Sequence, residues 1–386
     1  MPRQWQRKRA ISNPTKNIEW NGYIEMFKQL SGCIDREPVN KARQRELDIA
    51  KGFIIILMSL SHAIEILGWF FAPEGADGFF WYGFDMLIKG TAPVFIFCMG
   101  ISLCYSRKQS ASDIFRRALN MAGLVVLLET FRTLIPCFLE WLIFRDLDSI
   151  EYAYQFLCVD ILQFATMALL AIALFKKLKL RPVAMLAVAV VCSVVGQILN
   201  GLSTGSMIGD FAVGYIWHSH DTAYFPFLNW FIVLLMGYSL GYMWLRLKDK
   251  DRFFKLVTPI SLVIGVAYYA SMVLIGKWYY FSGEDYCGIG ILDVIFMIVI
   301  FFATVGISYY CGKRMPRVSR IFESMGNRVT SIYCIHWTIY AFLYLALVCL
   351  MGENYLPIWT VPPVGIAVVI IADLISRFYK KHLLKK

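Results

Sequence analysis

The sequence predicts an all-α, polytopic integral membrane protein, a bundle of about ten transmembrane helices with both termini in the cytoplasm. The chain of 386 residues is 58% hydrophobic and has a mean hydropathy of +0.58. This is more apolar surface than the core of a soluble protein of this size can bury. Apolar runs of about 18 residues or more recur along it, and this length crosses a bilayer. Lysine and arginine gather in alternate loops between these runs, as expected of cytoplasmic segments.

The predicted organisation is one membrane domain, residues 43–379, between a basic cytoplasmic arm, 1–42, and a basic tail, 380–386. The arm contains no apolar segment followed by a small-residue cleavage site, so we expect the first transmembrane helix to direct insertion. The net charge of +11 belongs to the arm and the short loops, which favours a membrane surface over nucleic acid as partner. The expected spans lie near residues 53–71, 84–105, 118–144, 155–175, 182–201, 225–245, 257–276, 288–311, 329–351 and 358–378.

The first expected span carries the most informative polar side chain, His62. If this helix enters the hydrocarbon near Gly52, a rise of 1.5 Å per residue places His62 roughly 15 Å deep, near the midplane. Ionisable side chains at that depth are costly and usually face a cavity. Helical spacing puts Lys51, His62 and Glu65 on one stripe. We therefore predict that His62 is a general base, oriented by the carboxylate of either Glu65 or Glu129.

Other charged side chains within the expected spans are the next candidates, because each costs about 2.5–3.5 kcal/mol at a helix centre. Glu129 and Arg132 lie three residues apart on one helix face. They form either an ion pair that satisfies itself or part of a functional site, and the spacing favours neither. Asp160 and Gln163 have the same spacing. Asp160 and Asp293 lie nearer the span ends, where capping or solvation explains them better than chemistry does.

Histidine and cysteine patterns give no metal site. His336, in the ninth span, is better explained as a hydrogen-bonded packing residue. His218, His220 and Asp221 form an HxHD cluster, but the sequence specifies no third ligand, so we interpret the cluster as part of a polar loop. The ten cysteines include no CxxC pair, and most lie in apolar runs, so we expect neither a disulfide framework nor a zinc site.

The segment ELDIAKGFIIILMSLSH, residues 46–62, resembles the opening signature of the transmembrane acyltransferases. In that signature a leucine-aspartate pair and a basic residue before glycine precede an intramembrane histidine. The chain is similar in particular to the heparan-alpha-glucosaminide N-acetyltransferase catalytic-domain family, and also to the type-3 acyltransferases. The likeness runs over roughly residues 43–345 in collinear order. The other supporting stretches are FIFCMGISLCYS (95–106), RRALNMAGLVVLL (116–128), VDILQFATM (159–167), DTAYFPFLNWFIVLLMGYSLGYM (221–243) and MGNRVTSIYCIHWTI (325–339).

The resemblance implies transfer of an acetyl group from cytosolic acetyl-CoA to an amine or hydroxyl of a sugar on the far side of the membrane. His62 stands at the position of the catalytic histidine of the type-3 enzymes, whereas the lysosomal-type enzymes have asparagine there and use a histidine in the following loop. N- and O-transfer therefore both stay open. Lys51 stands where these families usually have arginine, which keeps the charge but not the bidentate fork for phosphate.

This interpretation divides the candidate residues into three groups. The catalytic group is His62, Glu65, Glu129 and Arg132; the acyl-CoA-binding group is Lys51, Arg116, Arg117, Arg328 and His336; and the acceptor-binding group is Asp160, Gln163, Asp221, Tyr224 and Trp230. Besides acetyl-CoA as donor, the expected partners are a carbohydrate or glycolipid acceptor and the lipid bilayer, with a homodimer left open. The expected location is the cell membrane, with a role in the cell envelope, and no metal is expected.

Two other functions compete with acyl transfer. In a small-solute or ion transporter, Glu129, Arg132, Asp160 and Asp293 would bind or relay the solute. That function predicts an inverted repeat, and none is evident in the sequence. The second alternative is a catalytically inactive sensor or scaffold on the acyltransferase fold.

Overall fold

The computed structural model describes residues 30–68, 76–145, 152–219, 222–275, 286–352 and 355–382. Regular structure in these residues is helical, and the only β contacts among them are isolated bridges. Eight helical segments are long and apolar enough to cross a membrane, so the chain is a multi-pass membrane protein. They are α2 (Arg45–Leu67), α5 to α6 (Ala111–Phe144), α9 (Pro182–Leu199), α11 (Phe227–Arg246), α12 (Lys250–Ile275), α13 (Ile291–Arg314), α15 (Val329–Met351) and the segment Ile358–His382, which contains α16 (Val361–His382).

Two of the ten predicted spans are shorter than expected. The span predicted at 84–105 is divided into α3 (Ala76–Lys89) and α4 (Pro93–Tyr105). Pro93 explains the start of α4, because proline has no N–H to continue a preceding helix and fits the first helical position. The span predicted at 155–175 becomes the 17-residue α8 (Ile161–Lys177), which follows the short 3₁₀ helix η2 (Ala153–Leu157). The count of ten and the cytoplasmic termini stay predictions.

Helix α2 begins at Arg45, eight residues before the predicted span at 53. Its first turn holds two acidic side chains, Glu46 and Asp48, which suit the positive end of a helix dipole. Both are buried and paired: Glu46 with Lys250 at 2.6 Å, and Asp48 with Lys51 at 2.7 Å. The charged start of α2 is therefore part of the packed structure.

Backbone packs directly on backbone where α14 (Pro316–Gly326) crosses α2. A Cβ atom built on Gly52 would lie 1.9 Å from the carbonyl oxygen of Phe322, and one built on Gly326 would lie 1.9 Å from that of Asp48. Neither position can hold a larger side chain without moving the helices apart. These two glycines allow α14 to pack directly across the charged N-terminal part of α2.

The long helix Ala111–Phe144 contains one widened turn. Residues Thr130–Leu134 form a π-helical turn, η1, between α5 (Ala111–Glu129) and α6 (Ile135–Phe144). Pro136 accounts for it locally, since proline cannot donate to the carbonyl four residues back and clashes with that group in a regular helix. π turns are frequent at functional sites, and this one carries Arg132.

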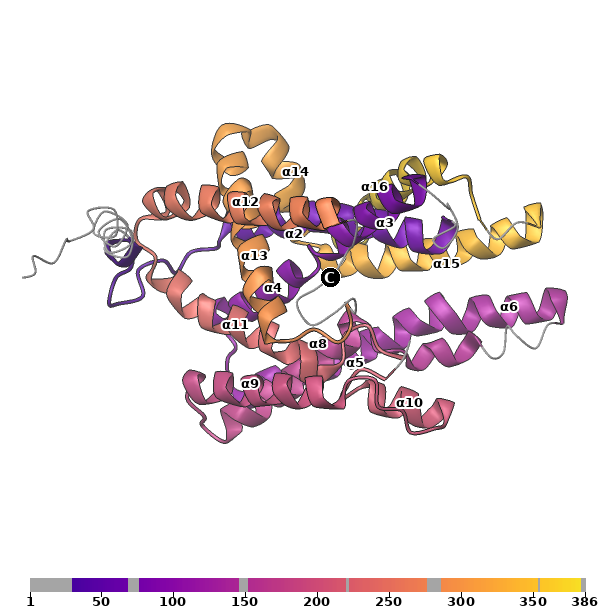
Figure 1. Ribbon diagram of the computed structural model, residues 1–386, viewed down its shortest axis with the longest axis horizontal. Helices are drawn as coiled ribbons and strands as arrows, with labels where there is room; N and C mark the ends of the chain where they lie inside the picture. Colours follow the sequence, from indigo (N-terminus) through magenta and orange to yellow (C-terminus); the bar gives the residue numbers. More distant parts are fainter. Residues whose placement is uncertain are drawn as a thin grey trace, which may run out of the picture.

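Figure 1 shows the arrangement that results. Helices α5, α6, α9 and α10 (Met207–Gly214) lie along one side of the molecule, and α2, α15 and α16 lie along the other. The largest apolar core joins α4, α11 and α13 and contains the fully buried rings of Trp230, Trp244 and Phe301. α15 and α6 come from opposite sides, and side chains from both line the cavity described next.

Candidate active site

A cavity of about 600 Å³ lies among α2, α6, α8 and α15, and the ends of α3 and α4. His62 of α2 lines it. Charged side chains on its wall come from five segments: Glu65, Lys89, Arg132, Glu140 and Asp160. Aromatic side chains complete the wall: Tyr152, Tyr224, Phe225, Tyr286, Tyr333, Trp337, Tyr344 and Tyr355. Convergent polar groups in an aromatic cavity are the usual make-up of a ligand site.

His62 is held by α15. Its Nδ1 lies 2.9 Å from Nε2 of His336, and the planes of the two rings are within 5° of parallel. Nδ1 of His336 in turn lies 2.9 Å from the carbonyl oxygen of Ile332. His336 itself is completely buried at 0% exposure, whereas His62 is half-buried and faces the cavity. Burial and two hydrogen bonds fit the packing role of His336, and its partner is the candidate catalytic residue; its assignment to acyl-CoA binding stays a prediction.

The face of the His62 ring is covered by Trp337, whose ring centroid lies 4.1 Å away. The guanidinium of Arg132 lies over the Trp337 ring, 4.5 Å from its centroid. This is a cation–π contact in a partly buried place, where it is worth more than at an exposed one. Trp337 therefore contacts both His62 and Arg132.

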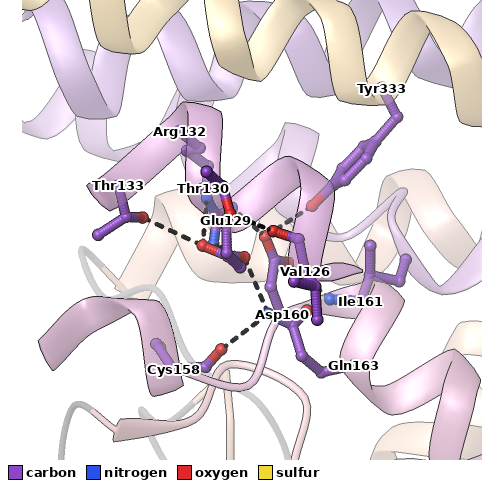
Figure 2. Close-up of polar contacts among 10 residues, drawn as sticks. All are labelled: Val126, Glu129, Thr130, Arg132, Thr133, Cys158, Asp160, Ile161, Gln163 and Tyr333. Atoms are coloured by element: carbon purple, nitrogen blue, oxygen red, sulfur yellow. Dashed lines mark hydrogen bonds and ion pairs between the residues drawn. The ribbon is translucent and has the colours of Figure 1, made fainter. Parts of the chain in front are cut away.

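Figure 2 shows the polar network that holds Arg132. Its Nη2 donates to Glu129 at 2.7 Å and its Nη1 donates to Asp160 at 2.6 Å. Thr133 and Gln163 donate to the same Glu129 carboxylate at 3.1 and 2.9 Å. Glu129 and Arg132 do form an ion pair, but the pair does not satisfy itself alone: it belongs to a larger network that joins α5, η1 and α8.

Asp160 has two functions in this network. Its Oδ1 accepts from the backbone N–H of Ile161 at 2.6 Å, which caps α8, so the predicted capping role is confirmed. Its Oδ2 accepts from Arg132 and, at 2.6 Å, from the hydroxyl of Tyr333. Tyr333 lies one turn before His336 on α15. Asp160 thereby ties the helix that carries His336 to the network around Arg132.

The structure adds site residues that the sequence interpretation missed. Lys89 lines the cavity and pairs with Asp85 at 2.9 Å, and Ser61 donates to the same carboxylate at 2.6 Å. Asp85 is fully buried. The signal for this pair is the spacing of four residues inside an apolar run, which places both side chains on one helix face. Tyr333 and Trp337 were missed too, although both lie one turn or less from His336.

The predicted acceptor residues take different positions. Tyr224 lines the cavity with its side chain 43% exposed, and the nearby carboxylate of Glu65 raises the pKa of its hydroxyl. Trp230 does not line the cavity. It is fully buried, donates to the carbonyl of Cys287 at 3.0 Å and packs on Tyr286, which is part of the wall. Gln163 donates a hydrogen bond to Glu129, the carboxylate that also accepts from Arg132. Asp221 lies outside the described residues.

The HxHD cluster is described only in part, because His220 and Asp221 lie outside the described residues. Nδ1 of His218 lies 3.2 Å from the carbonyl oxygen of Ala223. Asp293, the other acidic residue singled out, accepts from the backbone N–H of Gly290 at 2.8 Å and so stabilises the start of α13. Within the described ranges, no three His, Cys, Asp or Glu side chains are placed to hold a metal ion.

The basic residues predicted to bind the donor lie away from the cavity wall. Lys51 pairs with Asp48, and Arg328 pairs with Asp373. Arg116 and Arg117 are exposed near the start of α5. Lys51 and His62 are eleven positions apart on α2, which is about 16 Å along the helix. None of these four cations lines the described part of the cavity.

A buried apolar group, the Met58 cluster, lies between these cations and His62. On α2 its members Ile55 and Met58 fall between Lys51 and His62, and on α15 its member Ile332 falls between Arg328 and His336. Met58 also forms part of the cavity wall. The cluster consists of Ile55, Met58, Ala92, Leu128, Leu162, Met325, Ile332, Tyr333, Val369 and Ala372. The cluster therefore lies between the cavity and the basic residues Lys51 and Arg328.

Fold and cavity together define a multi-pass membrane protein with an imidazole held in a polar internal site, a class that includes membrane-embedded transferases. The family model described as "Heparan-alpha-glucosaminide N-acetyltransferase, catalytic" matches residues 43–265, more than half of the chain. The protein belongs to this family of membrane acetyltransferases. No curated protein and no solved structure matches the chain. The family match includes His62, Arg132 and Asp160, and ends before α15, which supplies His336 and Trp337.

Proposed function

We propose that the protein transfers an acetyl group from cytosolic acetyl-CoA to an amino or hydroxyl group of a carbohydrate on the opposite side of the membrane. Family membership supports acetyl transfer as the class of reaction. The observation that carries the proposal is the position of His62. It lies on the membrane-spanning helix α2, and its ring lines a polar cavity between helices. A base placed there can meet substrates that arrive from opposite ends of the bundle.

In the proposed reaction, His62 takes the proton from the acceptor as its oxygen or nitrogen attacks the thioester carbonyl. The new C–O or C–N bond forms, the C–S bond breaks, and the proton on His62 passes to the departing thiolate to give CoA. Arg132 and Lys89 line the cavity, each paired with carboxylates, and their remaining N–H groups can donate to the carbonyl oxygen as negative charge develops on it. In a two-step transfer, the same imidazole would carry the acetyl group itself.

The donor and the acceptor reach His62 from different ends in this proposal. The nucleotide of acetyl-CoA binds near Lys51, Arg116, Arg117 and Arg328, and the pantetheine arm extends along α2. Ile55 and Met58 must move for the thioester to reach the cavity, because they lie between the two sites. The acceptor occupies the aromatic part of the cavity, where Tyr224 and Tyr286 offer ring faces and hydroxyl groups to a sugar.

The decisive experiment replaces His62 by alanine. Purified protein is reconstituted into vesicles with labelled acetyl-CoA and a panel of sugar acceptors. We expect His62→Ala to lower transfer by about 10²–10⁴-fold. The matched control is His382→Ala, because His382 is exposed at the end of α16, and it should retain full transfer. Unchanged transfer in His62→Ala contradicts the proposal.

The same variant separates the alternatives. A transporter would retain solute flux in vesicles that contain His62→Ala, and a sensor would retain partner binding. Neither a transporter nor a sensor would transfer acetyl groups even with His62 intact. The donor is tested with a pair of substrates, acetyl-CoA and acetyl-pantetheine, which lacks the nucleotide. Arg117→Ala should raise the KM for acetyl-CoA and leave that for acetyl-pantetheine unchanged. Equal effects on both donors would contradict the proposed nucleotide site.

A further inference from the structure

His336 has one feature that its packing role does not explain. It is fully buried and does not line the cavity, yet both of its ring nitrogens are engaged. One nitrogen contacts a backbone carbonyl of its own helix, and the other contacts His62. A histidine that touches no substrate can still act on a reaction through the residue that it orients.

The proton positions follow from the partners. The carbonyl oxygen of Ile332 can only accept, so Nδ1 of His336 carries the proton and donates to it. In the neutral ring Nε2 of His336 is then an acceptor. Nδ1 of His62, 2.9 Å away, must be the donor in that contact. This leaves Nε2 of the neutral His62 ring without a proton, as a base requires.

We propose that His336 is the positioning residue of His62, and that it holds His62 in the tautomer whose Nε2 accepts the proton from the acceptor. The effect of this tautomer on catalysis rests on the proposed function, whereas the tautomer itself does not. The pair replaces the carboxylate that usually orients a catalytic histidine. Neither Glu65 nor Glu129 is needed for this task, because Nδ1 of His62 already has a partner.

The surroundings restrict the pair to one arrangement. Trp337 covers the face of the His62 ring, and Tyr333 anchors α15 to Asp160 one turn from His336. Glu129 already accepts hydrogen bonds from Arg132, Thr133 and Gln163. When His62 takes a proton at Nε2, its Nδ1 proton continues to donate to His336. His336 stays neutral throughout, and the proton leaves from the nitrogen at which it arrived.

The direct test is nitrogen-15 NMR of the histidine rings in the full-length protein in lipid bilayers. The chain has five histidines, and His62→Ala assigns the signals of His62. We expect the His62 Nδ1 signal to be that of a protonated nitrogen and the Nε2 signal that of an unprotonated one. The opposite tautomer of His62 in the unmodified protein overturns the inference, whatever the enzyme activity.

Two variants of His336 test its effect on the reaction. His336→Gln can place an amide oxygen near the former Nε2 and keep an acceptor for His62, whereas His336→Leu cannot. We expect the leucine variant to lose the single tautomer and about 10²-fold in kcat with an unchanged KM for the donor, and the glutamine variant to stay within about tenfold of the original kcat. Equal kcat in the two variants overturns the positioning role.

Two further outcomes keep the inference distinct from the proposed function. Glu65→Gln should leave the tautomer of His62 unchanged, and a change there would give the positioning role to Glu65 and overturn the inference. A protein that shows the expected tautomer, responds to His336→Leu in the spectrum and transfers no acetyl group from acetyl-CoA refutes the proposed function alone. The spectrum of the unmodified protein decides the tautomer even if the leucine variant fails to fold.

Discussion

Replacing Arg132 by methionine should destabilise the protein strongly. Methionine has a comparable length but no charge, so it leaves Glu129, 1% exposed, and Asp160, 7% exposed, without their shared cation. Removing one partner of a buried ion pair costs about 3–5 kcal/mol, because the remaining charge stays desolvated. The Arg132 side chain is 12% exposed and borders the cavity, where water screens part of the effect, so we expect the lower end, about 3 kcal/mol.

The measurement is the thermal stability of purified variants in one detergent. Arg145→Met is the control, since Arg145 is exposed at the end of α6 and stacks on Trp141 at 4.8 Å; its effect should stay within about 0.5 kcal/mol. A triple variant, Arg132→Met with Glu129→Gln and Asp160→Asn, should recover much of the loss because no buried charge is left. The explanation is wrong if Arg132→Met resembles the control, or if the triple variant is no more stable than Arg132→Met.

The remaining predictions concern helix packing and capping, and the same stability assay measures both. Gly52→Ala should cost about 1–3 kcal/mol or more, because its Cβ would lie 1.9 Å from the Phe322 carbonyl oxygen. Gly123→Ala, with nothing within 4 Å of the added atom, should stabilise α5 by up to about 1 kcal/mol, and a loss equal to that of Gly52→Ala would refute the packing argument. Asp293→Ala should cost about 1 kcal/mol by removing the acceptor for Gly290. Asp293→Asn retains an acceptor and should retain most of the stability, and a loss as large as that of alanine would contradict the capping role.

Composition and local spacing predicted the parts of this protein that depend on neighbouring residues. The helical membrane class follows from apolar runs. The contact between Glu129 and Arg132 follows from a spacing of three residues, and the capping roles of Asp160 and Asp293 follow from their places at the ends of apolar segments. His62 was singled out because a histidine deep in an apolar helix needs a polar environment.

Contacts between helices could not be predicted in this way. His62 and His336 are 274 positions apart, and nothing in either local segment determines the rotation that brings the two rings together. The π turn adds to this uncertainty, because an extra residue in one turn changes which side chains face α8 and α15. The sequence interpretation assigned Trp230 to acceptor binding, whereas α11 packs its ring in the core, against Tyr286.

The Met58 cluster has a consequence for the cell beyond catalysis. A water-filled passage through a membrane protein would let protons and ions run down the transmembrane voltage, which is worth about 2.3 kcal/mol per elementary charge for every 100 mV. Ile55, Met58 and Leu162 place apolar side chains at the end of the cavity nearest the basic residues, where they offer no polar group to a passing ion. An apolar layer beside a polar cavity opposes such leakage, because an ion that crosses it loses its hydration.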